Sequence, residues 1–231
     1  MLRELSKERI AVPNGFALTA DAYFDFLEKG GIKEKIAEIV STIDTSHIKD
    51  LLKKSSQIRN LILKTPLPKD LEEKVFSFYS KLSQEYGQIQ TDVAVRSSAT
   101  AEDLPTASFA GMHESFLNIK GRKDLISAIK KCFSSLFLAR AISYREEKDF
   151  DHMKIAISVG VQKMIRSDLA CAGIIFTLDT ESGFPDVTVI NGTWGLGEMI
   201  VKGKITSDEF FVAERMVEKG YPAIIKKNLG W

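Results

Sequence analysis

An arginine that follows a short apolar strand is the residue best placed for chemistry in this chain. Val93, Ala94 and Val95 lead directly into Arg96, two serines follow it, and small residues are frequent over positions 99–111. Small side chains let backbone N–H groups approach a ligand closely, and a planar guanidinium grips phosphate through paired donors. The pattern predicts a cradle for a polyphosphate, although it lacks the Gly-x-x-x-x-Gly-Lys spacing of a P-loop.

The same stretch, VAVRSSATAEDLPTASFAGMHESFLNIKG, resembles the nucleotide-binding region of the phosphoenolpyruvate synthase family, whose first domain is of the ATP-grasp type. The pyruvate phosphate dikinases and the rifampicin phosphotransferases are similar but more distant. Further matches follow in the same order along nearly the whole chain, at residues 12–27, 57–62, 136–145, 160–184 and 193–212. The segment IRSDLACAGIIFTLDTESGF resembles the synthases more than the rifampicin enzymes.

The resemblance implies which residues hold the phosphates of ATP. Arg96 lies where the family has its phosphate-binding arginine, and Gly111 and Ser115 lie where a glycine and a threonine approach the nucleotide. Ser115 keeps the hydroxyl, so a hydrogen bond to phosphate or ribose remains available. A simpler interpretation stays open for each: a surface arginine at a strand end, a hairpin glycine and a strand serine.

A second set of residues resembles the part of the family that borders the base and the ribose. Gln162 begins this segment, and Met164 with Ile165 can supply the extended backbone and the apolar side chains that an adenine slot needs. Met164 can equally be plain core. Glu198, in a turn that resembles the family's GLGE, either contacts ribose hydroxyls or caps the segment that follows.

The histidine that carries the phosphoryl group in the resembling dikinases is absent from this chain. His47, His113 and His152 occur, none in a glycine-rich, threonine-containing motif, and we expect surface or core histidines. We therefore predict no catalytic residue here. The resemblance implies ATP and Mg²⁺ as cofactors, with metal ligands outside this chain. Pyruvate would bind to domains that this sequence lacks, carried on the same or a separate chain.

Two departures from the family pattern bear on activity. A Gly-Gly-Lys-Asn-Ala-Ser-Leu-Gly-Glu-like segment, whose lysine is expected to reach the phosphates, is absent before Met1, and the complete enzymes continue well beyond Trp231. Charged hydrogen bonds are worth roughly 1.5–3 kcal/mol each, so about three such losses weaken binding by three or more powers of ten. We expect this chain alone to bind ATP poorly and to turn over nothing, as part of an enzyme of the pyruvate, water dikinase type.

Composition and charge exclude several classes of protein. Hydrophobic residues make up 44% and charged residues 27% of the 231 positions, which is typical of a soluble globular chain. A net charge of +1 gives no reason to expect nucleic acid or a membrane as partner. The first ten residues lack the apolar core of a signal peptide, so we expect a cytoplasmic protein. Cys132 and Cys171 are then expected to be buried thiols rather than a disulfide or a metal site.

The hydrophobic pattern predicts an α+β chain with an incomplete ATP-grasp-like domain. A mostly helical subdomain is expected over residues 1–91 and an α+β ATP-binding subdomain over 92–231. Helical spacing and capping residues predict helices from Thr19 to about 29, over 32–40, from Ser46 to before Pro66, from Pro68 to Gly87 and over 122–148. Apolar or alternating runs predict strands over 92–98, 114–120, 154–164, 170–178, 187–191 and 209–213.

Two rival functions remain open. A rifampicin or glucan dikinase shares the first domain, and the cradle residues recognise ATP rather than the acceptor. A short chain that begins with its own methionine also suits a non-catalytic nucleotide-binding module. A neighbouring gene that encodes the remaining domains would favour an enzyme subunit.

Overall fold

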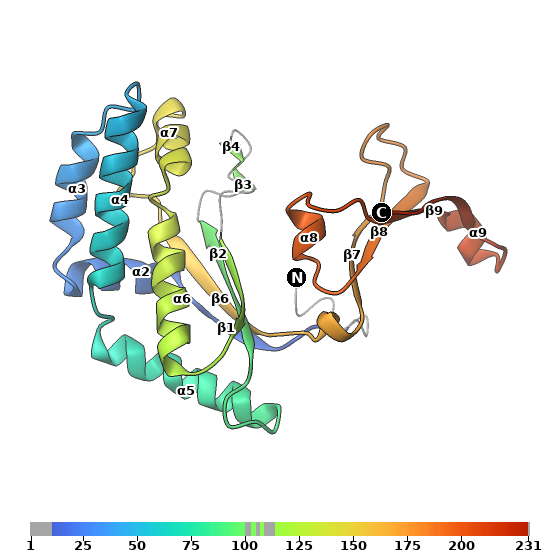
Figure 1. Cartoon of the computed structure of the whole chain (residues 1–231), viewed down its shortest axis with the longest axis horizontal. Helices are drawn as coiled ribbons and strands as arrows, with labels where there is room; N and C mark the ends of the chain where they lie inside the picture. Colours follow the sequence, from blue (N-terminus) through green and yellow to red (C-terminus); the bar gives the residue numbers. More distant parts are fainter. Residues whose placement is uncertain (1–10, 100–102, 105–106, 109–113, 231) are drawn as a thin grey trace. The chain divides into compact units, whose positions relative to one another are not determined.

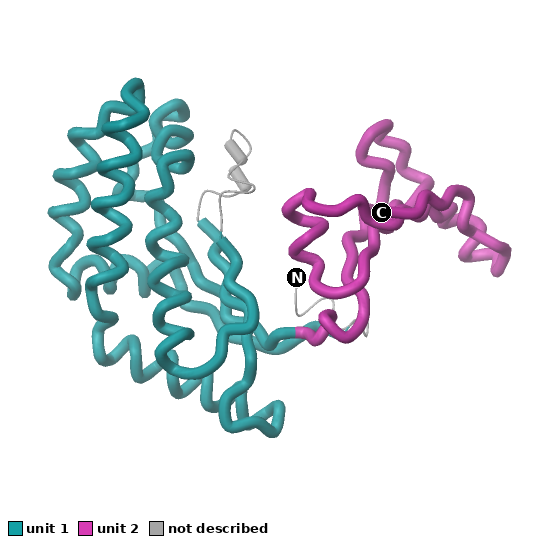
Figure 2. The backbone as a smooth tube through the Cα atoms, in the orientation of Figure 1, with its two compact units in different colours: residues 1–164 teal, residues 165–231 magenta. Residues whose placement is uncertain are grey.

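The chain folds into two compact units, residues 1–164 and residues 165–231 (Figures 1 and 2). The computed structural model describes residues 11–99, 103–104, 107–108 and 114–230. Helices and antiparallel sheets occur together, so the prediction of an α+β chain is confirmed.

The first helices of unit 1 begin and end close to the residues that the sequence signals predict. Thr19 is the N-cap of the first of them and Gly30 its C-cap, as predicted. The third starts two residues later than expected, at Ile48 with His47 as its N-cap, because Ser46 lies in a turn in which its own N–H donates to Asp44 Oδ1. The helices described in this unit are α2 (Ala20–Lys29), α3 (Lys33–Ser41), α4 (Ile48–Lys64), α5 (Lys69–Glu85), α6 (Arg122–Ser135) and α7 (Ala139–Glu147).

The single helix predicted over residues 122–148 is wrong, because the chain turns between α6 and α7. Leu138 has an extended backbone, with ψ of 141°. Consecutive helical residues point about 100° apart. The three adjacent apolar side chains of Leu136, Phe137 and Leu138 therefore do not share one helix face. The turn lets Phe137 be fully buried, and its carbonyl accepts a hydrogen bond from the Ser55 hydroxyl at 2.7 Å.

Four antiparallel strands form the sheet of unit 1, in the order β1-β6-β2-β5. Their bounds are Gly15–Leu18 for β1, Val93–Ala99 for β2, Ser115–Ile119 for β5 and Ile157–Lys163 for β6. The edge strand β1 was not predicted from the sequence. A separate two-stranded ladder joins β3 (Asp103–Leu104) to β4 (Ala107–Ser108).

One face of this sheet carries the core of unit 1. Val93, Val95, Val159 and Val161 alternate along β2 and β6 and are fully buried. Helix α6 packs against β2, β5 and β6, as Figure 1 shows. It brings Phe133 against aromatic rings of α2, with ring centroids 5.3–5.4 Å apart. The side chains on the opposite face of the sheet lie outside this core cluster.

Unit 2 is a second four-stranded antiparallel sheet, in the order β10-β9-β8-β7. Its elements are a 3-10 turn at Ser167–Leu169, β7 (Cys171–Phe176), β8 (Val187–Trp194), α8 (Glu198–Val201), β9 (Asp208–Ala213), α9 (Glu214–Glu218) and β10 (Ile224–Asn228). Cys171 lies on the edge strand β7 and is exposed, so the expectation that it is buried is wrong. Cys132 of α6 is buried as expected, and burial raises the pKa of its thiol to about 12.

Candidate functional site

The face of the unit 1 sheet that lies opposite the core is built from small and polar residues. Paired residues of antiparallel strands point to the same side, and every second residue along a strand shares that side. The register therefore places nine residues on this side, which we call the polar sheet face: Gly15, Ala17, Ala94, Arg96, Ser98, Ser115, Ser158, Gly160 and Gln162.

Arg96 and Ser115 are direct cross-strand partners on the polar sheet face. Arg96 of β2 pairs with Ser115 of β5, and both are exposed. A guanidinium beside a hydroxyl offers several N–H and O–H donors to one anion. The structure thus brings together two of the three residues predicted for the phosphates. Gly111, the third, lies outside the described residues.

Gln162 lies on the same face as Arg96, two residues along β6 from the partner of Arg96. It is half-buried and pairs with Ala94 on one side and Gly15 on the other. Its side-chain amide donates to the Pro13 carbonyl oxygen at 3.0 Å, which fixes the orientation of the side chain. The amide oxygen keeps its capacity to accept a hydrogen bond from a ligand.

Met164 ends unit 1, and its backbone is already tied to the protein. Its N–H donates to the Asp92 carbonyl oxygen at 3.0 Å, and its own carbonyl accepts from the Lys163 ammonium at 3.0 Å. The side chain is 7% exposed. The donor edge predicted for adenine is therefore not offered by the Met164 N–H. Ile165, the next residue, is 57% exposed.

The ion pair of Lys163 with Asp92 was missed by sequence reasoning. The two atoms, Nζ and Oδ1, are 2.7 Å apart, and only 10% and 26% of the side chains are exposed. The Lys163 ammonium lies 5.8 Å from the Tyr86 ring centroid. Lys163 stood inside the predicted base-binding segment, but its partner is 71 positions away, so spacing gave no signal.

Glu198 belongs to unit 2, where it serves the short helix α8. It is the first residue of α8, and its carboxylate forms an ion pair with Lys202 one turn later. Gly195, in the turn before α8, has φ of +81°, a conformation that favours glycine. The N-cap of α8 is Gly197 and makes no side-chain capping bond, so Glu198 does not cap the helix, and its contact with ribose stays a prediction.

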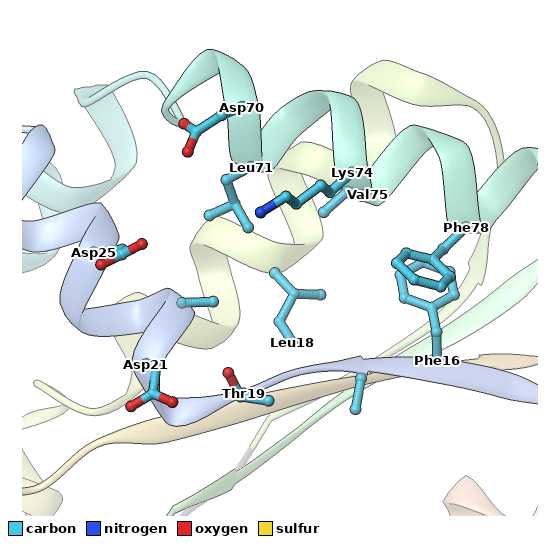
Figure 3. Close-up of a pocket in the computed structure, with 12 residues that line it drawn as sticks. Phe16, Leu18, Thr19, Asp21, Asp25, Asp70, Leu71, Lys74, Val75 and Phe78 are labelled. Carbon is cyan, nitrogen blue, oxygen red and sulfur yellow. The ribbon is translucent and has the colours of Figure 1, made fainter.

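A separate cavity of about 270 Å³ lies between β1, α2 and α5 (Figure 3). The rings of Phe16 and Phe78 stack at its side with centroids 5.7 Å apart. Asp21, Asp25 and Asp70 surround it, and a hydrogen bond from Lys29 lowers the pKa of the Asp70 carboxyl. The three carboxylates outnumber Lys74, the cation that also lines the cavity, and net negative charge repels a polyphosphate, so this cavity is not suited to the nucleotide.

The described histidines occupy structural positions. His47 is exposed, and its Nδ1 lies 2.7 Å from Asp44 Oδ2. His152 lies between Arg145 and Glu146, at 2.9 and 3.1 Å. His113 is outside the described residues.

The described ranges contain neither a cluster of metal ligands nor a membrane-spanning helix. Over these ranges, no three His, Cys, Asp or Glu side chains gather into a metal site. The helices described here are all too short or too polar to cross a membrane.

Comparison with known proteins gives one consistent family. Residues 1–230 match the model of the pyruvate phosphate dikinase AMP/ATP-binding domain. Phosphoenolpyruvate synthases of Helicobacter pylori, Aquifex aeolicus and Escherichia coli are 52%, 50% and 45% identical to this chain over 230 residues. The alignments cover all of this chain but only 27–29% of each relative, so it spans less than a third of their length. The chain belongs to the pyruvate phosphate dikinase AMP/ATP-binding domain family.

Proposed function

We propose that this chain is the ATP-binding portion of a phosphoenolpyruvate synthase. The proposal is supported by the family match over residues 1–230 and by relatives of that name at 45–52% identity. The parent reaction converts ATP, pyruvate and water into AMP, phosphoenolpyruvate and phosphate. In it, this chain holds ATP while a histidine outside the chain receives the phosphoryl group and passes it to pyruvate.

The polar sheet face is the proposed nucleotide site. Arg96, Gly111 and Ser115 hold the phosphates, and the cross-strand pairing of Arg96 with Ser115 supports this part. Gln162 and Met164 border the base, and Glu198 contacts the ribose. Mg²⁺ neutralises charge on the phosphates, and we assign its ligands to residues outside this chain.

Further parts of the proposal concern the whole protein. The domain is of the ATP-grasp type, with a helical subdomain over 1–91 and an ATP-binding subdomain over 92–231. Pyruvate binds to domains outside these residues, on the same or a separate chain, and the protein works in the cytoplasm. Residues 1–231 alone bind ATP weakly and release no product.

The main structural support for this proposal is the cross-strand pairing of Arg96 with Ser115 on the polar sheet face. Replacing Arg96 by alanine removes at least one charged hydrogen bond worth about 1.5–3 kcal/mol, so the Kd for ATP rises about 10- to 100-fold. Arg96→Lys keeps the charge but loses the paired donors, so its Kd for ATP lies between that of the unaltered protein and that of Arg96→Ala.

The Kd is measured by isothermal titration calorimetry of ATP with the full-length protein. Arg122→Ala is the matched control, because Arg122 is also exposed and pairs with Glu72 on the helical side of unit 1. Equal ATP affinity of Arg96→Ala and the unaltered protein would contradict the assignment of Arg96 to the phosphates. Absence of ATP binding by the unaltered protein would contradict the nucleotide site as a whole.

A further inference from the structure

Gly160 is a glycine that the fold of unit 1 does not require. It lies in the middle of β6, where a glycine weakens a sheet. A Cβ added there meets only the Arg96 carbonyl oxygen, at 3.9 Å, which is an ordinary contact. A Cβ added at Gly15 would lie 2.3 Å from the Val161 carbonyl oxygen. Backbone packing therefore demands glycine at position 15 and accommodates alanine at position 160.

The position of Gly160 links the two halves of the proposed nucleotide site. One row crosses all four strands of the sheet through Ala17, Gly160, Arg96 and Ser115. Gln162 lies two residues further along β6, about 7 Å away on the same face. Gly160 and Ala94 are the two positions of this face that lie between Arg96 and Gln162, and of the two only Gly160 leaves bare backbone.

We infer that the ribose of the bound nucleotide lies directly over Gly160, and that the missing side chain sets how close the nucleotide comes to the sheet. This inference rests on the proposed function. Ribose joins base to phosphates, so a nucleotide that reaches from Gln162 to Arg96 passes over the adjacent positions Gly160 and Ala94, and it can approach the backbone most closely at Gly160. Side chains stand roughly perpendicular to a sheet, so a methyl group at this position projects into that path.

The energetic consequence of a side chain at position 160 follows from hydrogen-bond geometry. A methyl group that lifts the ribose also lengthens the bonds that the phosphates make with Arg96 and Ser115. Hydrogen bonds from N–H to oxygen usually span about 2.7–3.2 Å and weaken when they are longer or bent. Binding therefore falls, while the sheet itself gains stability from a residue better suited to a strand than glycine.

Two variants of the full-length protein test whether the ribose lies over Gly160. We expect Gly160→Ala to weaken ATP binding about 10-fold and Gly160→Val about 100-fold, which is 1.4 kcal/mol per decade. We also expect Gly160→Ala to raise the melting temperature by about 1–4 °C. Greater stability together with weaker binding is not the signature of a misfolded variant.

A matched control adds bulk to the opposite face of the same strand. Val161 is buried in the core next to Gly160, and Val161→Ile adds one methylene there. The Kd of this variant for ATP stays within about 2-fold of that of the unaltered protein, although its stability can fall because the core is overpacked.

Inorganic tripolyphosphate, which has no ribose, separates the ribose contact from the phosphate contact. Gly160→Val keeps the affinity of the unaltered protein for tripolyphosphate in competition with ATP, and Arg96→Ala loses it. Unchanged ATP binding by Gly160→Val overturns this inference alone, and equal losses of ATP and tripolyphosphate overturn the assignment to the ribose. Failure of the unaltered protein to bind ATP overturns both this inference and the proposed function.

Discussion

Arg96 and Ser115 show how much of the candidate site depends on strand register. They are 19 positions apart in the sequence, and only the antiparallel pairing of β2 with β5 makes them neighbours. A shift of one residue would turn Ser115 to the core side. The ladder is irregular between Val93 and Val95, near Asn118 with φ of 56°, so the register that places Ser115 follows a bulge.

Ser115 provides a test of the hydroxyl beside Arg96. Ser115→Ala removes one hydrogen bond, which costs about 0.5–1.5 kcal/mol, so the Kd for ATP rises about 2- to 12-fold. Ser115→Thr keeps the hydroxyl on a residue that suits a strand, and its affinity stays within about 2-fold. Titration of ATP into each variant gives both values. Equal losses in the two variants would contradict a role for the hydroxyl.

Arg145 is a buried cation that the sequence pattern did not reveal. It is fully buried, and its Nε donates to Nδ1 of His152 at 2.9 Å. Because Nδ1 accepts this bond, the imidazole proton lies on Nε2 and points to Glu146 at 3.1 Å. Burial lowers the pKa of Arg145 to about 10, and its terminal nitrogens have no hydrogen-bond partner among the described residues.

The His152 environment predicts a loss of stability in mild acid. Burial lowers the pKa of His152, Arg145 lowers it further, and Glu146 and Asp151 oppose this only partly. In the unfolded chain the pKa of His152 is near 6.5, so its imidazole binds a proton more readily there than in the folded chain. The stability that neutral His152 contributes to the fold is fully present above about pH 6.5. It is lost as the pH falls from there towards the lower pKa of His152 in the folded chain.

Replacing His152 by asparagine checks this dependence. Asparagine keeps an acceptor for Arg145 but does not titrate. Melting temperatures measured by circular dichroism between pH 8 and pH 5.5 should fall less in His152→Asn than in the unaltered chain. The other histidines are common to both proteins and cancel in the comparison. Parallel pH profiles would show that His152 does not titrate in this window.

At the scale of elements, local signals predicted most helices and the longer strands. Thr19 and Gly30 delimit α2 as expected, and β2 and β6 follow from their apolar or alternating runs. The strand β1 has only four residues and pairs with β6, over 140 positions away, so its pattern was too short to detect. The turn between α6 and α7 was missed because burial of Phe137 is a tertiary effect.

The candidate site was predictable only in part for the same reason. Motif resemblance selected Arg96, Ser115 and Gln162, and the sheet places all three on one face. Local sequence did not show that the Met164 N–H donates to Asp92, or that Gly160 lies beside Arg96. Each of these depends on a strand partner more than 60 positions away.

Tyr79 of α5 joins three elements through one buried hydroxyl. The hydroxyl donates to the Thr91 carbonyl oxygen at 2.6 Å and accepts from the Gly121 N–H at 3.0 Å. These bonds hold α5 to the residues that precede β2 and α6. The helix, although its apolar stripe was evident in the sequence, is thus positioned by a polar contact that the stripe does not indicate.

Removing that hydroxyl should destabilise unit 1. Tyr79→Phe leaves a buried carbonyl and a buried N–H without their partner, at a cost of about 1–3 kcal/mol in the free energy of unfolding. Chemical denaturation measures this loss. Tyr221→Phe is the control, because Tyr221 is 64% exposed in unit 2. Equal stability of the two variants would contradict the role assigned to Tyr79.

Across the whole molecule, the two units differ in how well they bury their apolar residues. The core cluster consists of residues of unit 1, whereas Val187 and Val189 are the buried apolar side chains of the described part of unit 2. Ile175 and Phe176 point to opposite faces of β7 and are 64% and 39% exposed. Neither face of that strand is therefore well covered by the described residues of unit 2.

Unequal burial predicts unequal resistance to local unfolding. Segments with few buried apolar contacts open at lower free energy and exchange their amide hydrogens sooner. In the 231-residue chain, we expect peptides from β7 and β8 to exchange at least about 10-fold faster than peptides from β2 and β6. Hydrogen exchange followed by mass spectrometry resolves these peptides. Equal protection of both sheets would mean that hydrogen bonding within the unit 2 sheet, rather than apolar burial, sets its stability.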